Sequence, residues 1–155
     1  MAIRRIIRED EPLLRKKSRE VESFNERLFV LLDDMTETLI EANGVGLAAP
    51  QVGILRRVVL VDTGNTIIEM INPKMLSRDG EEVCDIEGCL SSPGEYGMVP
   101  RPEKVTAEYY DRNGKRHEIS VDGLSARAIC HELDHLDGVL FRDLAVRMLD
   151  PEELE

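Results

Sequence analysis

The sequence predicts a mixed fold in which α-helices accompany antiparallel β-hairpins. Two pairs of β-rich runs are each joined by a short turn: residues 57–61 with 66–71, and residues 104–110 with 115–121. The Asn-Gly step within Asp111–Gly114 is a strong signal for the second hairpin. Apolar residues at helical spacing predict one helix before the first hairpin and another after the second.

Composition indicates a single globular domain over residues 1–155. The 155 residues are 42% hydrophobic, which is enough to bury a core around one site. The 31 acidic residues against 20 basic ones give a net charge of -11, which argues against binding to DNA or to anionic membranes. Three cysteines form no secreted-type framework, and no stretch approaches the length of a signal peptide or a membrane span. We therefore expect a cytoplasmic protein.

The first helix is predicted around residues 28–39. Its apolar positions recur at helical spacing and should face a core: Leu28, Leu31, Leu32, Met35 and Leu39. Ser23 and Glu26 are suited to a capping box, and Asn43–Gly44 to the end of the helix. Residues 1–22 contain a proline and many charges, so we expect an irregular surface arm anchored by isoleucines: Ile3, Ile6 and Ile7.

The small, nearly uncharged segment Gly44–Gln51 follows this helix. Its glycines allow a ligand to approach the backbone closely, and Gln51 offers one amide donor group and one acceptor. Such a segment could bind the main chain of a ligand and direct an amide toward a reacting group. A tight turn into the next strand, capped by Gln51, would explain the same residues equally well.

Between the two hairpins, Asn72–Pro73 is expected to end a strand, and the polar residues 77–82 to form a loop. Cys89 follows within Glu87–Ser91, and Pro93–Gly94 comes one residue after this segment. This rigid setting could present a thiolate to a metal ion. The alternative is a free cysteine buried as a small apolar side chain.

The segment His131–His135 has the HExxH pattern, on a second helix predicted from Leu124 to Gly138. Histidines four apart project from one face of a helix, so the two imidazoles can bind one metal ion. Glu132 would lie beside the metal and could take a proton from a water molecule. The pattern therefore predicts metal-assisted hydrolysis, with a chance match on a polar helix as the alternative.

A catalytic site of this kind needs a third ligand. Phe141 stands where a metzincin would have its third histidine, and the short acidic tail leaves no room for a second packed helix that could supply a carboxylate. An upstream ligand is therefore required. Cys89 is better placed than His117, which falls inside a strand, or Cys84, which falls in a charged loop. Two histidines and one cysteine leave a fourth position open for water.

These residues make the chain resemble the peptide deformylase family. Three motifs occur in that family's order and approximate spacing: Gly44–Gln51, Glu87–Ser91 and His131–His135. The resemblance implies an α+β fold in which antiparallel β-sheets pack around a central α-helix that contains the HExxH motif. It also implies an enzyme of bacterial protein biosynthesis, a hydrolase that removes the formyl group from the N-terminal formylmethionine of newly made proteins and releases formate.

The resemblance also implies the role of each residue. One divalent metal ion per chain, commonly Fe²⁺ with Zn²⁺ able to replace it, would have three protein ligands: Cys89, His131 and His135. Glu132 would act as general base and then as general acid. The Gln51 side-chain amide and the Leu90 backbone N–H would stabilise an oxyanion. Backbone pairing and a methionine pocket would involve six residues: Val45, Gly46, Arg101, Leu124, Arg127 and Ala128.

The implied partner is an N-formylmethionyl nascent peptide. Some bacterial relatives dock on the ribosome through a basic C-terminal extension, whereas the tail here, Asp150–Glu155, is acidic and would be repelled by RNA phosphates. Two other functions remain open. A different HExxH amidase or protease could use the same three ligands, and a structural metal-binding protein would close the fourth position with Cys84 or His117.

Overall fold

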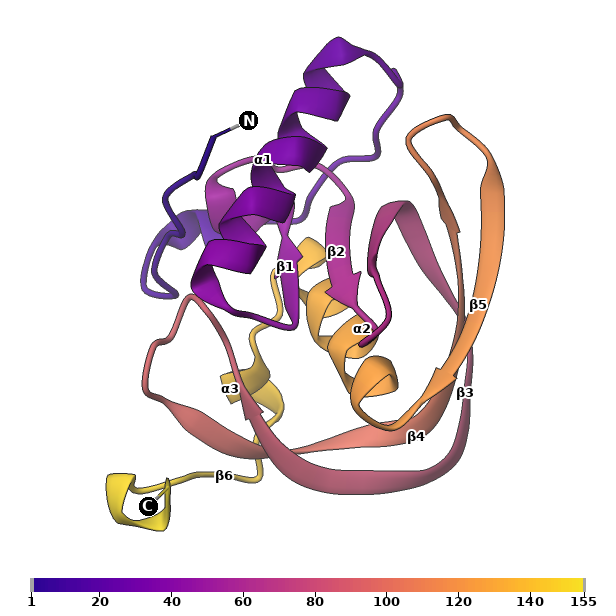
Figure 1. Cartoon of the computed structure of the whole chain (residues 1–155). Helices are drawn as coiled ribbons and strands as arrows, with labels where there is room; N and C mark the ends of the chain where they lie inside the picture. Colours follow the sequence, from indigo (N-terminus) through magenta and orange to yellow (C-terminus); the bar gives the residue numbers. More distant parts are fainter. Residues whose placement is uncertain (1, 155) are drawn as a thin grey trace.

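The computed structural model describes residues 2–154, which form one antiparallel sheet and several helices (Figure 1). The strands of this six-stranded sheet are β1 (Gly46–Ala48), β2 (Val58–Asp62), β3 (Ile67–Gly88), β4 (Tyr96–Tyr110), β5 (Arg116–Asp122) and β6 (Arg147–Met148). The α-helices are α1 (Glu26–Ala42), α2 (Gly123–Leu136) and α3 (Phe141–Leu144), and the 3-10 helices are η1 (Pro12–Arg15), η2 (Ala49–Val52) and η3 (Pro151–Leu154). No helix within these residues is both long and apolar enough to cross a membrane.

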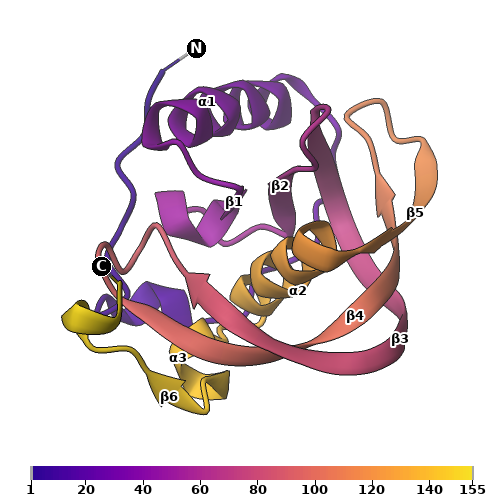
Figure 2. The same cartoon turned by 60° about the horizontal axis from the view of Figure 1, so that its bottom comes forward.

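The sheet has the strand order β1-β2-β3-β4-β5, and β6 pairs with β4. Every pairing is antiparallel. Both predicted hairpins are confirmed, because β2 pairs with the first part of β3 and β4 pairs with β5. Beyond the first hairpin, β3 and β4 form a long two-stranded ribbon that curves around α2 (Figures 1 and 2).

The strand β3 is longer than the sequence predicted. We expected it to end at Asn72–Pro73 and residues 77–82 to form a loop, but it continues to Gly88. The pairing of β3 with β4 has irregularities of register, the first between Ile71 and Lys74. The proline lies within this irregularity, where its missing N–H interrupts no regular ladder, so the strand can pass through it.

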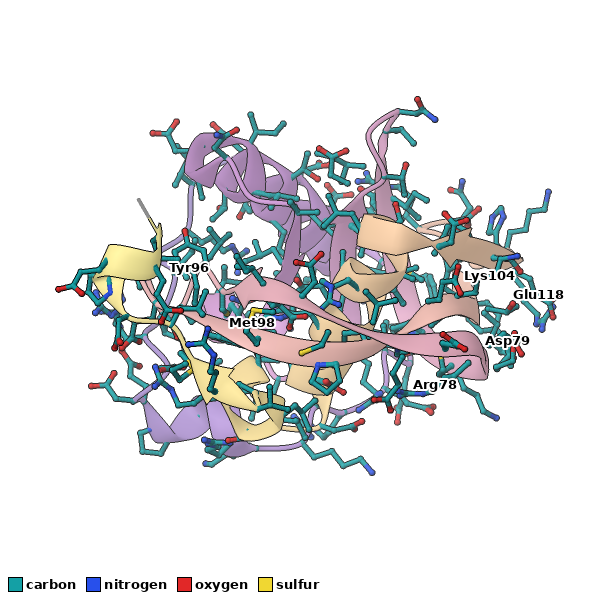
Figure 3. All side chains as sticks on the ribbon, turned by 90° about the horizontal axis from the view of Figure 1, so that it is seen from below. Arg78, Asp79, Tyr96, Met98, Lys104 and Glu118 are labelled. Atoms are coloured by element: carbon teal, nitrogen blue, oxygen red, sulfur yellow. The ribbon has the colours of Figure 1, made fainter. Side chains whose placement is uncertain are left out.

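The curved ribbon joins two distant parts of the molecule. Figure 3 shows Tyr96 toward one end of the ribbon, and Asp79 and Lys104, which are partners in register, toward the other. Gly88, the last residue of β3, pairs with Tyr96. The chain that leaves this end of the ribbon therefore leads directly into Cys89.

The strand β2 is buried on both faces and separates two parts of the core. Val59 and Val61 pack in the cluster that includes α2, whereas Val58 and Leu60 pack in the cluster that includes α1. Side chains alternate between the two faces of a strand, so consecutive valines of β2 meet different helices. The helices α1 and α2 are thereby fixed on opposite faces of the sheet.

The first helix ends where the sequence predicted but begins with a different cap. Asn25 is the N-cap of α1, and its side chain accepts a hydrogen bond from the N–H of Leu28 at 3.3 Å, so the expected capping box of Ser23 and Glu26 is not formed. At the other end Asn43 adopts the left-handed conformation with φ 56°. Asparagine tolerates this conformation, which terminates the helix.

The N-terminal arm contacts the rest of the protein through two of its three isoleucines. Ile7 is buried and Ile6 is half-buried against the α1 cluster, whereas Ile3 is 54% exposed. The Arg4 side chain donates a hydrogen bond to Asp34 of α1 at 2.9 Å. The arm is therefore held against the rest of the protein. Ile6 and Ile7 are anchors, as predicted, whereas Ile3 is not.

Gly138, just after α2, should not tolerate alanine. Its φ is +75°, and a Cβ would overlap the carbonyl group of Arg15, whereas Gly114 has φ +81° with open space around the Cβ position. Gly114→Ala should lower the free energy of unfolding by about 1–2 kcal/mol through left-handed strain alone. Gly138→Ala should lower it by about 1–3 kcal/mol more, because of the overlap. Urea unfolding of both variants measures the difference, and equal losses would contradict the role given to Arg15.

Candidate metal centre

The helix α2 and the chain that follows β3 bring three potential metal ligands together. The candidate ligand atoms of Cys89, His131 and His135 all lie within 4.8 Å of one another. The Cys89 Sγ is 3.3 Å from the His135 Nε2. Both imidazoles come from one face of α2, as their spacing requires, and the cysteine approaches that face from the end of the β3–β4 ribbon. The three side chains could hold a metal ion.

Burial and neighbouring charge act differently on the two imidazoles. Burial lowers the pKa of His135, and the adjacent His131 lowers it further, so His135 is neutral, the form that binds metals. Burial also acts to lower the pKa of His131, but this effect is outweighed by the Glu132 and Glu87 carboxylates and the Cys89 sulfur, and its pKa is raised. The site thus concentrates negative charge around His131.

Neither alternative fourth ligand joins this group. Cys84 is exposed on β3, and His117 on β5 bonds Asp111 at 2.7 Å and stacks on the Tyr109 ring. Cys130 is buried in the core cluster of α2, and burial raises the pKa of its thiol. Within residues 2–154, the group that could hold a metal therefore contains two histidines and one cysteine, as in an open rather than a closed site.

The Glu87 carboxylate orients His131. His131 Nδ1 and Glu87 Oε2 are 2.6 Å apart, and Arg101 donates to the same carboxylate through Nε at 3.1 Å and Nη2 at 2.6 Å. Arg127 Nη1 adds a further hydrogen bond at 3.1 Å. Although burial alone would raise its pKa, the hydrogen bonds from His131 and Arg101 lower the pKa of Glu87 to about 2. The ionised carboxylate can accept a hydrogen bond from His131 Nδ1, so Nε2 is the ring nitrogen that remains for a metal once its proton is lost.

The placement of Arg101 does not support its predicted contact with the substrate main chain. Its guanidinium is 3% exposed and also donates to Asp134 of α2 at 2.6 Å. Each of its three nitrogens thus donates to a carboxylate, and the side chain links Glu87 to α2. Sequence reasoning missed this role of Glu87 and Asp134. The available signal was that Glu87 lies two residues before Cys89. Its hydrogen-bond partners could not be recognised, because His131 and Arg101 lie far from it in the sequence.

Glu132 lies buried beside the candidate ligands. Burial raises the pKa of its carboxyl group to about 7, while the charge of His131 acts in the opposite direction. Its Oε1 has no hydrogen-bond partner among the described residues. The other oxygen faces Gly46, where a Cβ would lie 2.5 Å from it. Glycine at this position leaves room for the carboxylate next to β1.

A pocket of about 550 Å³ opens onto this centre. Cys89, His131 and Glu132 line it, together with most of the residues predicted to contact a substrate or stabilise an oxyanion: Val45, Gly46, Gln51, Leu90, Leu124, Arg127 and Ala128. Arg101 is not part of the lining. Segments that are distant in the sequence therefore meet in one cavity, as the three motifs suggested.

The Gln51 side chain is held in a fixed orientation. Its Oε1 accepts a hydrogen bond from the Ala48 N–H at 2.9 Å, which leaves the Nε2 group pointing toward the centre. That nitrogen donates to Ser91 Oγ at 3.1 Å and lies 3.5 Å from Cys89 Sγ. The amide is buried, and its orientation brings an N–H group next to the candidate ligand.

Comparison with known proteins gives a consistent result. Residues 3–150 match the model of a family described as polypeptide deformylase. A peptide deformylase from Caldicellulosiruptor bescii is 51% identical over 155 residues, which is 100% of this chain and 93% of the relative. One from Caldanaerobacter subterraneus subsp. tengcongensis is 52% identical over 155 residues, covering 100% of this chain and 97% of the relative.

Solved structures show the same similarity. A crystal structure of peptide deformylase from Thermotoga maritima superposes with a TM-score of 0.91 at 39% identity, covering 94% of this chain and 99% of that one. A peptide deformylase from Synechococcus elongatus in complex with actinonin superposes with a TM-score of 0.90 at 39% identity, covering 96% and 81% of the two chains. The mixed fold with a curved antiparallel sheet is shared with these proteins, and the chain belongs to the polypeptide deformylase family.

Proposed function

We propose that this chain hydrolyses the formyl group from the N-terminal formylmethionine of newly synthesised proteins and releases formate. The observation that supports this most directly is the convergence of Cys89, His131 and His135 next to a pocket that is lined by Cys89, His131 and the buried Glu132. The similarity to bacterial peptide deformylases over the whole chain supports the same reaction. In this proposal α2 is the metal-binding helix around which the sheet of the single catalytic domain, residues 1–155, is packed.

The donor atoms fit one divalent metal ion. Two imidazoles and one thiolate suit Fe²⁺ and Zn²⁺, and we propose Fe²⁺ as the native ion with Zn²⁺ able to replace it. A bound ion would make water more acidic and polarise the formyl oxygen. Cys89, His131 and His135 would hold it, and Glu87 would keep His131 in the required orientation through the hydrogen bond to Nδ1.

Glu132 is the proton carrier in this mechanism. Its Oε1 is free of hydrogen bonds among the described residues, so it can accept a proton from the attacking water. The water oxygen bonds to the formyl carbon, the carbon–nitrogen bond then breaks, and Glu132 returns the proton to the departing amine nitrogen. The products are formate and a free N-terminal methionine.

Two amide groups stabilise the oxyanion that forms at the formyl carbon. The Gln51 Nε2 group lies 3.5 Å from Cys89 Sγ and is fixed by the hydrogen bonds described above. The second donor is the backbone N–H of Leu90, the residue that follows Cys89 and lines the same pocket. Donors that are oriented before the reaction stabilise a developing charge without the cost of reorganisation.

The peptide main chain would bind along β1. Within the described residues this strand lies at the edge of the sheet and pairs only with β2, so Gly46 can offer main-chain groups to an added strand. Val45 directly precedes β1, and its carbonyl already accepts a hydrogen bond from the Asp62 N–H at 2.8 Å, so it would contact the substrate beside Gly46 without that carbonyl. Main-chain pairing is independent of side chains, which suits substrates that vary beyond methionine. The methionine side chain would occupy the part of the pocket lined by Leu124, Ala128 and the aliphatic portion of Arg127.

The proposed substrate places the enzyme in the cytoplasm, where it would meet nascent chains transiently at the ribosome. Its C-terminal segment forms η3, which contains two adjacent acidic residues, Glu152 and Glu153. Arg147 bonds Glu153 at 2.7 Å, so this cation is already paired. Docking through this segment on RNA phosphate is therefore disfavoured.

Replacing the proton carrier should abolish turnover without loss of metal. Glu132→Gln keeps the size of the side chain but removes the base, so we expect formate release from formyl-Met-Ala-Ser to fall by at least about 10²-fold, within the range typical of general-base catalysis. Metal content and thermal unfolding should match those of the wild type, both proteins being purified without oxygen and loaded with iron. A folded, metal-replete wild type that releases no formate would refute the proposed function.

Crowding the proton carrier from β1 should have a similar but milder effect. In Gly46→Ala the new methyl group would lie 2.5 Å from Glu132 Oε2, so the carboxylate must move. Since a displacement of about 1 Å can cost about 10²-fold in rate, we expect kcat to fall by roughly that factor while the metal remains bound. Steady-state kinetics and metal analysis test this, and wild-type kcat would show that Glu132 need not lie against β1.

Loss of the Glu87 charge should weaken metal binding. Glu87→Gln removes the carboxylate that orients His131, and partners of this kind typically contribute about 10- to 100-fold to metal affinity. Glu82→Gln is the matched control, because Glu82 is exposed on the same strand. Competition with a zinc chelator measures both affinities. Equal affinities for the two variants would show that Glu87 has no part in holding the metal.

A further inference from the structure

The N-terminal arm makes two backbone hydrogen bonds to the elements that contain the proposed oxyanion donors. The Ile7 N–H donates to the Gln51 carbonyl at 2.8 Å, and the Glu9 N–H donates to the Ser91 carbonyl at 3.0 Å. Gln51 belongs to η2, whereas Ser91 lies in the turn after Cys89. These bonds involve three consecutive residues of the arm, Ile7–Glu9, which we call the brace. The brace thus connects η2 to the turn after Cys89, two segments that are far apart in the sequence.

The brace is hydrogen-bonded to the backbone at or next to both proposed oxyanion donors, Gln51 and Leu90. Its first hydrogen bond is to the carbonyl of Gln51, the residue whose side-chain amide is one proposed oxyanion donor. Its second is to the carbonyl of Ser91, the residue after Leu90, whose backbone N–H is the other proposed oxyanion donor. The Gln51 Nε2 also bonds the Ser91 side chain at 3.1 Å. The separation of η2 from the turn after Cys89 therefore decides where the two N–H groups point relative to each other.

The brace is itself anchored from both sides. The Ile7 side chain is buried in a small cluster with Leu14 and Leu140. Glu9 accepts hydrogen bonds from Arg142 of α3, through Nε at 2.9 Å and Nη2 at 2.5 Å. The same guanidinium donates to Glu95 at 2.6 Å, so Arg142 links the brace to the chain that leaves the Cys89 turn.

We propose that Ile7–Glu9 positions Gln51 and Leu90 for oxyanion stabilisation, with Glu9 and Arg142 as the positioning pair; this inference rests on the proposed function. Neither Glu9 nor Arg142 lines the pocket, so neither touches substrate. Hydrogen-bond donors stabilise a transition state only when they are held in place beforehand. Loosening the brace should therefore lower kcat, while the binding of the ground-state peptide, and hence KM, changes little.

The test compares Glu9→Ala, Arg142→Met and the double variant with a matched control. The control is Arg15→Met, because Arg15 also joins the N-terminal region to α3, through Asp143 at 3.1 Å, but within the described residues it forms no hydrogen bond or ion pair with the brace or with the turn after Cys89. In iron-loaded enzymes with equal metal content, we expect each brace variant to lose about 10-fold in kcat, with KM within about twofold of the wild type. Arg15→Met should keep wild-type kcat.

Coupling between the two residues separates positioning from a general loss of stability. If they act as one pair, the double variant should be no slower than the slower single variant. Arg142→Lys, which can still bond Glu9, should recover part of the lost kcat. If Glu9→Ala does not fold, Glu9→Gln replaces it, with a smaller expected loss of about threefold, because the amide oxygen can still accept hydrogen bonds from Arg142 but has lost the negative charge.

A second readout does not depend on turnover. Amide hydrogen exchange in the zinc-loaded protein should be at least about 10-fold faster at Ile7 and Glu9 in Arg142→Met than in Arg15→Met. Unchanged kcat in the brace variants, or unchanged exchange at these amides, would overturn the inference. A wild type that releases no formate would instead refute the proposed function, so the two failures are distinguishable.

Discussion

The buried carboxylate of Glu87 is the interaction on which the site depends. It lies at the end of β3 and accepts hydrogen bonds from His131 and Arg127 of α2 and from Arg101 of β4. Three elements are thereby held at one point next to the candidate metal ligands. A buried charge is tolerated only when it is paired, so the removal of Glu87 would leave His131 Nδ1 without its partner, and the removal of a partner would leave the buried carboxylate with fewer hydrogen bonds.

The curved β3–β4 ribbon makes this arrangement possible. Cys89 is more than forty residues from the histidines, and the ribbon returns the chain to α2 after passing around it (Figure 2). The strand β2, buried on both faces, fixes α2 on one side of the sheet and α1 on the other. The sheet therefore holds α2 against the turn that contains Cys89. The 3-10 helix η2 and the N-terminal arm are bonded to each other next to this turn.

Sequence reasoning identified the features that depend on local chemistry. The hairpins, the end of α1 at Asn43 and the extent of α2 all follow from turn residues and periodicity over a few positions. It misjudged β3, where Pro73 was taken as an end and irregular register lets the strand continue. It placed Arg101 near the substrate main chain, and it could not foresee the bonds of that guanidinium to Glu87 and Asp134, because these carboxylates are distant from Arg101 in the sequence.

The sequence by itself determined the types of ligand and their spacing, since two histidines four residues apart on a helix must share a face wherever that helix lies. The resemblance of three motifs then indicated a family and a reaction. Only the tertiary structure decided that Glu87 orients His131, that Arg101 is buried between two carboxylates, and that Ile7–Glu9 bridges Gln51 to Ser91. These contacts join residues far apart in the chain, and no local pattern records which distant partner a buried polar group will find.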